Sequence, residues 1–185
     1  MRLRPLKMLW IAAVLGLAGM SARASGIIAE KSALTFVGEQ MGAPVQGRFQ
    51  RFDADILFKP TDLAHSHARL AVDLASIDLA SEDSESEIKG KSWFNVAAFP
   101  KAVFESTAFR ALGGDRFEVA GHITIKGIVR DLTLPLQVHT VAGQLYAEGS
   151  TTLRRSDFKV GEGVWADPDS VATDVRVNYK MALKP

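Results

Sequence analysis

The fold is constrained most by an alternation of apolar and polar side chains that recurs along this chain. Apolar residues take nearly every second position in residues 116–126, 131–139 and 171–183, and weaker series run through 69–74 and 145–153. Successive side chains of a β-strand point to opposite faces, so a period of two predicts strands with one buried face. About eight such antiparallel strands in a single domain predict an all-β chain, folded as a closed barrel or a two-sheet sandwich.

Two local signals refine this strand pattern. Val45 and Phe49 share one parity, whereas the apolar positions within residues 52–58 have the opposite parity. A one-residue slip at Gln50 and Arg51 returns both sets to one face, which predicts a β-bulge there. The Gly-Gly-Asp sequence at 113–115 lies between two apolar runs and predicts a hairpin turn.

One segment departs from the β pattern and predicts a short helix over residues 81–92. Its acidic residues come first and Lys89 and Lys91 come last, an order that complements the helix dipole. Ser84 and Glu87 have the spacing of a capping box at the start of such a helix.

The N-terminus has the three parts of a secretory signal peptide. Basic residues in 1–7 precede an apolar stretch at 8–20, and small residues end at Ala24. The stretch of 13 residues is shorter than the ~18 that a membrane-spanning helix needs, so we expect cleavage after Ala24 and export to the periplasm. We therefore divide the chain into a signal peptide at 1–24 and one domain at 25–185.

Composition excludes several classes of function for the exported domain. Four of the 22 basic residues lie in the signal segment and all 21 acidic residues lie beyond it, which leaves a net charge of −3. A charge of this sign does not favour nucleic-acid binding. The chain contains no cysteine, so thiol catalysis, disulfides and cysteine-based metal sites are excluded.

The histidines offer the main alternative to a binding function. His65 and His67 have the i, i+2 spacing that places two imidazoles on one side of a strand, as in some metal sites. They follow a loop-like stretch, and no third ligand is evident nearby. His122 and His139 have the polar parity of their strands, which favours solvent-facing side chains.

Arg155 has two interpretations from the sequence. In the Arg-Arg-Ser-Asp sequence at 154–157 it is a candidate for binding an anionic head group through charge-assisted hydrogen bonds. A pair between Arg155 and Asp157 that stabilises a strand end is the alternative, and we favour it.

Large aromatic residues are numerous for a domain of this size. They are either an ordinary core or the lining of a cavity for a long apolar ligand, and the sequence leaves both open. The candidates for an apolar pocket are Phe36, Phe49, Phe52, Phe58, Trp93, Phe94, Phe104 and Phe117.

Four motifs together resemble one family, the YceI-like proteins, which are often described as polyisoprenoid-binding periplasmic proteins. The motifs are VQGRF at 45–49, FPKAVFEST at 99–107, GHITIKG at 121–127 and RSDFKVG at 155–161. The resemblance covers about residues 27–183. It implies a lipocalin-like, extended eight-stranded antiparallel barrel that holds an isoprenoid, a quinone-like molecule or another long amphiphile. It also implies a cytochrome b561-type membrane protein as a partner. Apart from the resemblance, we consider a homodimer as one assembly state.

Two positions depart from the family pattern. The family often has a histidine late in its first strand, where this chain has Gln40. The family's helix often reads Arg-Asp-x-His-Leu, where this chain has Ser-Glu-Ser-Glu-Ile at 84–88. Gln40 and Arg155 are therefore our candidates for contact with a head group. We expect no cofactor and no catalytic residue.

Burying a methylene group stabilises a complex by roughly 0.8 kcal/mol, so an enclosed isoprenoid tail needs no catalytic group to be held. We consider three alternatives to such a carrier. The first is an enzyme that acts on a lipid or uses a metal at His65 and His67. The others are an outer-membrane barrel and a barrel filled by its own side chains.

Overall fold

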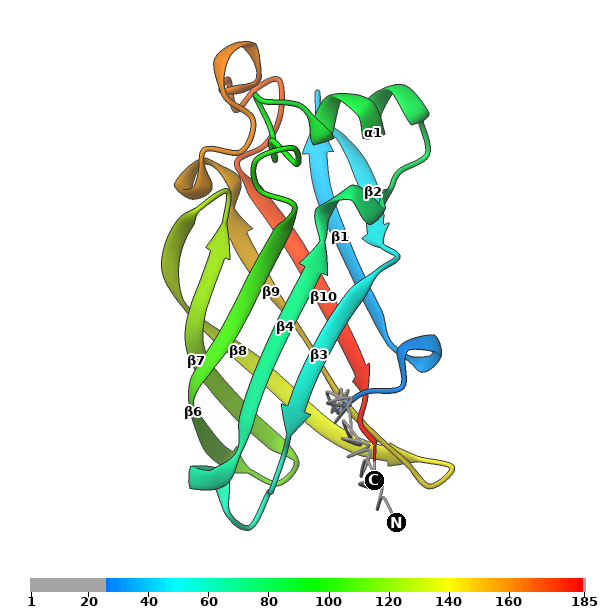
Figure 1. The fold of residues 1–185 in the computed structure, drawn as a ribbon, viewed down its shortest axis with the longest axis vertical. Coiled ribbons are helices and arrows are strands. Elements are labelled where there is room, and N and C mark those ends of the chain that lie inside the picture. Colours follow the sequence, from blue (N-terminus) through cyan, green and yellow to red (C-terminus); the bar gives the residue numbers. More distant parts are fainter. Residues whose placement is uncertain (1–25, 185) are drawn as a thin grey trace, which may run out of the picture.

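The computed structural model describes residues 26–184, which form one antiparallel sheet with one α-helix (Figure 1). The predicted signal peptide lies outside the described residues. No helix in the described part of the chain is long and apolar enough to span a membrane. The strands are β1 (Ala33–Gln40), β2 (Ala43–Phe49), β3 (Phe52–Leu57), β4 (His67–Asp73), β5 (Ile77–Asp78), β6 (Lys101–Gly113), β7 (Arg116–Ile125), β8 (Ile128–Val141), β9 (Gln144–Arg154) and β10 (Asp174–Ala182).

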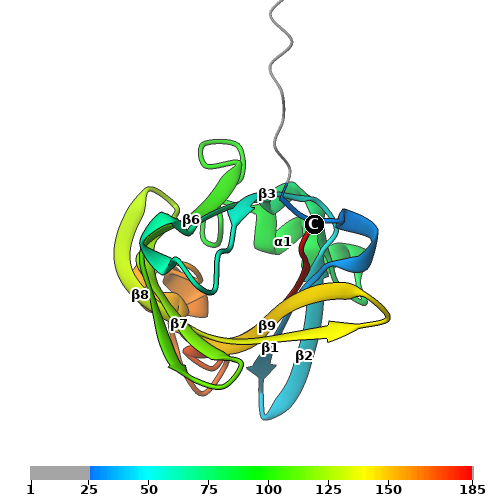
Figure 2. The same cartoon turned by 90° about the horizontal axis from the view of Figure 1, so that it is seen from below.

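The sheet closes on itself as a barrel. Its order is β3-β4-β6-β7-β8-β9-β10-β1-β2-β5, and the two edge strands are continuations of strands inside it. β3 follows β2 after two residues, and β5 follows β4 after one short turn, Leu74–Ser76. Because β2 pairs with β5 and β3 pairs with β4, the ten segments amount to eight long strands, two of which are bent. The predicted eight-stranded antiparallel barrel is confirmed, and Figure 2 shows its ring of strands from below.

The bend between β2 and β3 lies at the predicted bulge. The Gln50 amide donates to the Ser76 carbonyl at 3.0 Å, and the Asp73 amide donates to the Arg51 carbonyl at 3.0 Å. The Arg51 guanidinium also lies 2.8 Å from the Asp73 carboxylate, so backbone and side chains both continue the pairing across the interruption. The slip returns the apolar residues on either side of the bend to the barrel interior, as the parity change predicted.

Tight turns connect most neighbouring strands. The predicted turn at 113–115 joins β6 to β7, with Gly113 and Gly114 at positive φ. Ala142 and Gly143 join β8 to β9 and have φ of 49° and 79°. Positive φ at both central residues is the geometry of a type I′ turn, whose twist matches that of the strands it joins.

The helix α1 (Glu82–Lys89) is shorter than the helix predicted over residues 81–92. Its N-cap is Ser81, whose hydroxyl accepts from the Ser84 amide, so the capping box predicted at Ser84 and Glu87 is wrong. The order of acidic residues first and Lys89 last is as predicted. None of its residues is buried, which distinguishes it from a helix that packs on a core.

The buried side chains form two clusters at different heights in the barrel. The larger cluster lies toward the end with the turns at 113–115 and 142–143 and includes Phe117, Tyr179 and Met181. The smaller cluster lies toward the end with α1 and includes Trp93, together with Phe158 and Val160 from the irregular segment 155–173. We call the end with α1 and residues 155–173 the upper end, and the end with the turns at 113–115 and 142–143 the lower end, as they appear in Figure 1.

Candidate functional site

An internal cavity of about 640 Å³ occupies the barrel. This volume is within the roughly 300–1,000 Å³ that is usual for small-molecule sites. Most of its lining is aliphatic or aromatic, and the lining side chains come from the inward parity of every long strand. Leu70, Leu134 and Val177 are examples from β4, β8 and β10. The alternation that predicted the fold therefore also produces the apolar wall.

Six of the eight predicted pocket aromatics line this cavity. The structure brings together Phe36, Phe49, Phe58, Trp93, Phe94 and Phe104. Phe52 lines a separate groove beside the bend, and Phe117 lies below the cavity against Phe58. A ligand contact for any of these rings stays a prediction.

Other aromatic residues in the lining were missed. Phe109 follows a register shift in β6, and Phe158 and Trp165 lie in irregular turns, so no simple period marks them. Tyr179 shares the parity of its apolar neighbours in β10, a signal that was sufficient to include it.

Aromatic packing closes the lower end of the cavity. The centroid of the Phe58 ring lies 5.0 Å from that of the Phe117 ring and 6.1 Å from that of the Phe109 ring. The Phe58 and Phe117 rings are nearly perpendicular. Tyr179 is buried, and its hydroxyl donates to the Pro135 carbonyl. Burial raises the pKa of Tyr179 far above its ordinary range, which keeps its hydroxyl neutral.

Polar side chains surround the upper end of the cavity. Asp83, Ser84 and Glu87 line it from α1, and Glu39 and Gln40 line it from the end of β1. The Trp165 indole N–H donates to Glu87 at 2.9 Å, which ties the segment 155–173 to the helix. Gln40, a predicted head-group residue, therefore lies at the polar end, where a head group would be exposed to water.

Arg155 is buried at the upper end and holds the surrounding chain together. Its five N–H groups donate to the backbone carbonyls of Val160, Gly161, Trp165, Val171 and Ala172 at 2.6–3.0 Å. Its guanidinium also lies over the Trp93 ring, 5.5 Å from the centroid. The pair with Asp157 that we favoured is wrong, because Arg155 bonds to carbonyls instead.

The same bonds bear on Arg155 as a head-group residue. Arg155 does line the cavity, but a ligand would have to exchange one of its five carbonyl partners to accept from it. Burial lowers the pKa of Arg155, since the charged form loses water. Its contact with a head group stays a prediction.

Lys126 is a second cation that links the loops at the upper end through hydrogen bonds. Its ammonium donates to the carbonyls of Lys91 and Lys159 and to the Glu162 carboxylate at 2.8 Å. This donation lowers the pKa of Glu162 below its ordinary value. Two cations thus hold the loops around the mouth of the cavity.

Trp93 has an unusual donor in the cavity wall. Its ring lies 5.6 Å from the Trp165 ring, and the side chain is buried. Among the described residues, the Trp93 Nε1 atom is the one buried side-chain polar atom without a hydrogen-bond partner. Such a donor costs free energy when it is left unpaired.

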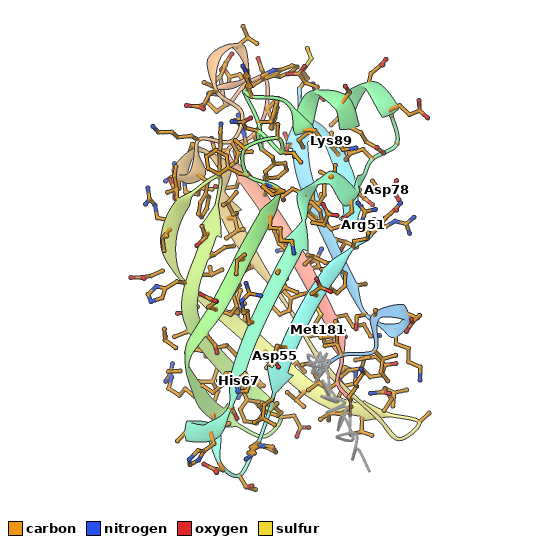
Figure 3. The ribbon with its side chains drawn as sticks, viewed as in Figure 1. Arg51, Asp55, His67, Asp78, Lys89 and Met181 are labelled. Atoms are coloured by element: carbon orange, nitrogen blue, oxygen red, sulfur yellow. The ribbon has the colours of Figure 1, made fainter. Side chains whose placement is uncertain are left out.

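The histidines lie outside the cavity and pair with acids. His65 lies 2.8 Å from Asp62, and His67 lies 3.6 Å from Asp55 on the neighbouring strand (Figure 3). Residues 26–184 contain no group of three or more side chains that could together hold a metal ion. The metal-dependent alternative at His65 and His67 therefore has no further ligands within the described chain.

His122 belongs to a row of alternating acidic and basic side chains across the outer face of five strands. Register places the members opposite one another on β3, β4, β6, β7 and β8. Arg69 lies 3.0 Å from Glu105, and His122 lies 2.8 Å from Asp131. The row consists of Asp55, Arg69, Glu105, His122 and Asp131. Its position agrees with the solvent-facing parity predicted for His122.

Sequence relatives of this chain cover part of its length. A UPF0312 protein of Yersinia pestis (strain Pestoides F) is 33% identical over 88 residues, which are 48% of this chain and 45% of the relative. A UPF0312 protein of Pseudomonas paraeruginosa is 25% identical over 120 residues, which are 62% of each. The chain thus spans about half to three fifths of the length of these curated relatives.

Solved structures share the barrel over most of the chain. BcnA of Burkholderia cenocepacia is 32% identical with a TM-score of 0.82, covering 85% of this chain and 99% of BcnA. A YCEI protein of Campylobacter jejuni is 20% identical with a TM-score of 0.66, covering 75% and 84%. A polyisoprenoid binding domain of Saccharophagus degradans, implicated in plant cell wall breakdown, is 16% identical with a TM-score of 0.66, covering 83% and 94%.

The fold, the four motifs and these similarities lead to the same assignment. The YceI-like domain family matches residues 26–183, nearly all of the part that the structure describes. This protein belongs to the YceI-like family.

Proposed function

We propose that this protein is an exported, non-enzymatic carrier that holds the tail of a long amphiphile inside its barrel. The observation that carries the proposal is the cavity of about 640 Å³, whose wall is mostly apolar and whose charged residues lie at one end. An isoprenoid or a quinone-like lipid has the matching form, a long hydrocarbon with one polar end. A structural neighbour is described as a polyisoprenoid binding domain, which supports the same class of ligand.

The energetics favour a carrier that encloses the tail. At roughly 0.8 kcal/mol per buried methylene, a five-carbon isoprene unit contributes roughly 3–4 kcal/mol before the costs of association. A few units inside the cavity are therefore enough for stable binding. The described histidines lie on the outer face, away from the apolar wall, which favours binding over catalysis as the role of the cavity.

The location and partners are part of the same proposal. The segment at 1–24 directs the chain to the periplasm, where an isoprenoid tail needs a protein to cover it in water. A cytochrome b561-type membrane protein is the partner implied by the resemblance, and a homodimer is one assembly state.

Mass spectrometry of organic extracts from natively purified protein tests the proposal. We expect about one isoprenoid or quinone-like lipid per chain. A Leu134→Trp variant, which fills the cavity from β8, should lose this lipid while Thr133→Trp, on the opposite parity of the same strand, retains it. A protein that carries no lipid and takes up no added isoprenoid contradicts the carrier function.

A further inference from the structure

The charged residues of the cavity are confined to its upper end and are mainly acidic. Within the described chain, the charged lining residues are Glu39, Asp83, Glu87 and Arg155. The five N–H groups of Arg155 already donate to carbonyls. The three carboxylates, all on exposed residues, are therefore the charged groups that can meet the polar end of a ligand, although Glu87 also accepts from the Trp165 indole.

The helix at the mouth turns a polar face toward the cavity. Asp83 and Glu87 are four residues apart and lie on one side of α1, with Ser84 beside them. A helix that served to close a barrel would turn its apolar stripe inward. Ile88 is the one apolar residue that α1 adds to the lining.

Two basic side chains near this mouth, Lys89 and Lys126, are engaged elsewhere. The Lys89 ammonium lies 3.4 Å from the Glu85 carboxylate within α1, and the Lys126 ammonium bonds to Glu162 and two carbonyls. Neither residue belongs to the lining of the cavity. The groups that line the mouth are thus mostly acceptors, with the Gln40 amide and the Ser84 hydroxyl as neutral donors.

We propose that the acidic mouth selects amphiphiles whose head group is uncharged and donates hydrogen bonds, as an alcohol or a quinol does, and discriminates against a phosphate on the same tail. This inference rests on the proposed carrier function and adds the class of head group. A carboxylate accepts hydrogen bonds from a hydroxyl, whereas a phosphate brings about −1.5 to −2 charges close to three carboxylates. Because the site is open to water, the discrimination depends on salt.

Tryptophan fluorescence of the full-length mature protein can test this, since Trp93 and Trp165 both line the cavity. The probes are geranylgeraniol and geranylgeranyl phosphate, which share a tail and differ in the head group. At low ionic strength we expect the alcohol to bind about tenfold more tightly than the phosphate. Added salt should shrink this ratio toward one by strengthening binding of the phosphate.

Amide substitutions separate charge from shape. The triple variant Glu39→Gln, Asp83→Asn and Glu87→Gln keeps the size of each side chain and leaves an oxygen to accept from Trp165. We expect it to bind the phosphate about tenfold more tightly than the wild type does and the alcohol nearly unchanged. The matched control changes three exposed acids that do not line the cavity: Glu30→Gln, Glu82→Gln and Asp115→Asn.

The outcomes distinguish the head-group selectivity from the carrier function on which it rests. Equal or tighter binding of the phosphate by the wild type overturns the head-group selectivity and leaves the carrier function standing. An identical rise in phosphate affinity in the control variant also overturns it, because net charge rather than the mouth would then be responsible. Failure of both probes to bind refutes the carrier proposal itself.

Discussion

The two ends of the barrel are stabilised in different ways. The lower end is closed by apolar packing, with Phe117 against Phe58 and the Tyr179 hydroxyl bonded to a carbonyl. The upper end is held by two cations, Arg155 and Lys126, which bind backbone carbonyls of the surrounding loops. The lower end resembles an ordinary core, whereas the upper end depends on hydrogen bonds to charge.

This difference has a physical reason. The open end of a cavity that admits a ligand cannot be filled by side chains. The loops around it must therefore be held by contacts outside the opening. Arg155 does this with five donors in one planar group, a number that no other side chain offers. The comparison teaches that hydrogen bonds from two cations supplement the packing of Trp93, Phe158 and Val160 at the upper end, whereas packing closes the lower end.

Removal of Arg155 should have the largest effect on the rim. Arg155→Met loses five hydrogen bonds of about 1 kcal/mol each, so we expect a loss of about 5 kcal/mol in the free energy of unfolding, measured with urea. Arg154→Met is the matched control, because Arg154 is exposed and lies 3.9 Å from Asp174, and it should cost less than about 1 kcal/mol. Similar losses in both variants would contradict the role given to Arg155.

Truncation of aromatic residues should separate the packed end from the cavity. Phe117→Ala removes a buried ring and should cost about 3–5 kcal/mol. Phe36→Ala enlarges an existing cavity, so we expect about 2 kcal/mol. Urea unfolding of both variants provides the measurement, and a larger loss at Phe36 would show that the lower end is not the better packed one.

Acid should weaken the upper rim through Glu162. Lys126 lowers the pKa of this carboxyl below its ordinary 4.5, so the pair stabilises the folded state above about pH 4.5, and the stabilisation is lost as the pH falls through the lowered value. Glu162→Gln should lower the melting temperature at pH 7 and flatten its decline in acid. Lys126→Met should abolish the same acid dependence, and the double variant should flatten it no further.

The two neighbouring tryptophans, Trp93 and Trp165, are expected to show the smallest effects. Trp93→Phe removes an N–H that has no acceptor, so we expect a change in unfolding free energy within about 0.5 kcal/mol. Trp165→Phe removes the hydrogen bond to Glu87 and should cost about 1 kcal/mol. A loss at Trp93 that exceeds the loss at Trp165 would indicate an acceptor for its N–H in the folded protein.

The four motifs of the resemblance are mainly parts of the scaffold. A Cβ on Gly47 would lie 2.4 Å from the Phe36 ring, and a Cβ on Gly121 would lie 2.7 Å from the Phe104 ring. Arg155 lies in another motif and supports the rim. These motifs therefore identify the fold, whereas the acids at the mouth, on which our head-group proposal rests, lie outside them.

Local periodicity was sufficient to predict the strands, the bulge and most of the cavity wall. A period of two assigns each residue of a strand to one face, and once the barrel is closed that face must be the interior. Phe36, Phe49 and Phe104 line the cavity for this reason, and Phe58 continues the parity of β3, whereas Trp93 and Phe94 lie in turns between α1 and β6, which have no such period. Phe52 and Phe117 share the inward parity but sit beside or below the cavity, because parity determines the face and says nothing of the height along the barrel.

The sequence alone therefore determined the strand class, the inward face, the short helix and the family. The tertiary structure decided how two bent strands close the barrel, which aromatic side chains close its lower end, and which carbonyls Arg155 binds. Its five carbonyls come from residues 160–172, an irregular segment without a repeating period, whose backbone positions only folding can set. Side-chain periodicity is a local property, whereas hydrogen bonds between loops depend on the assembled barrel.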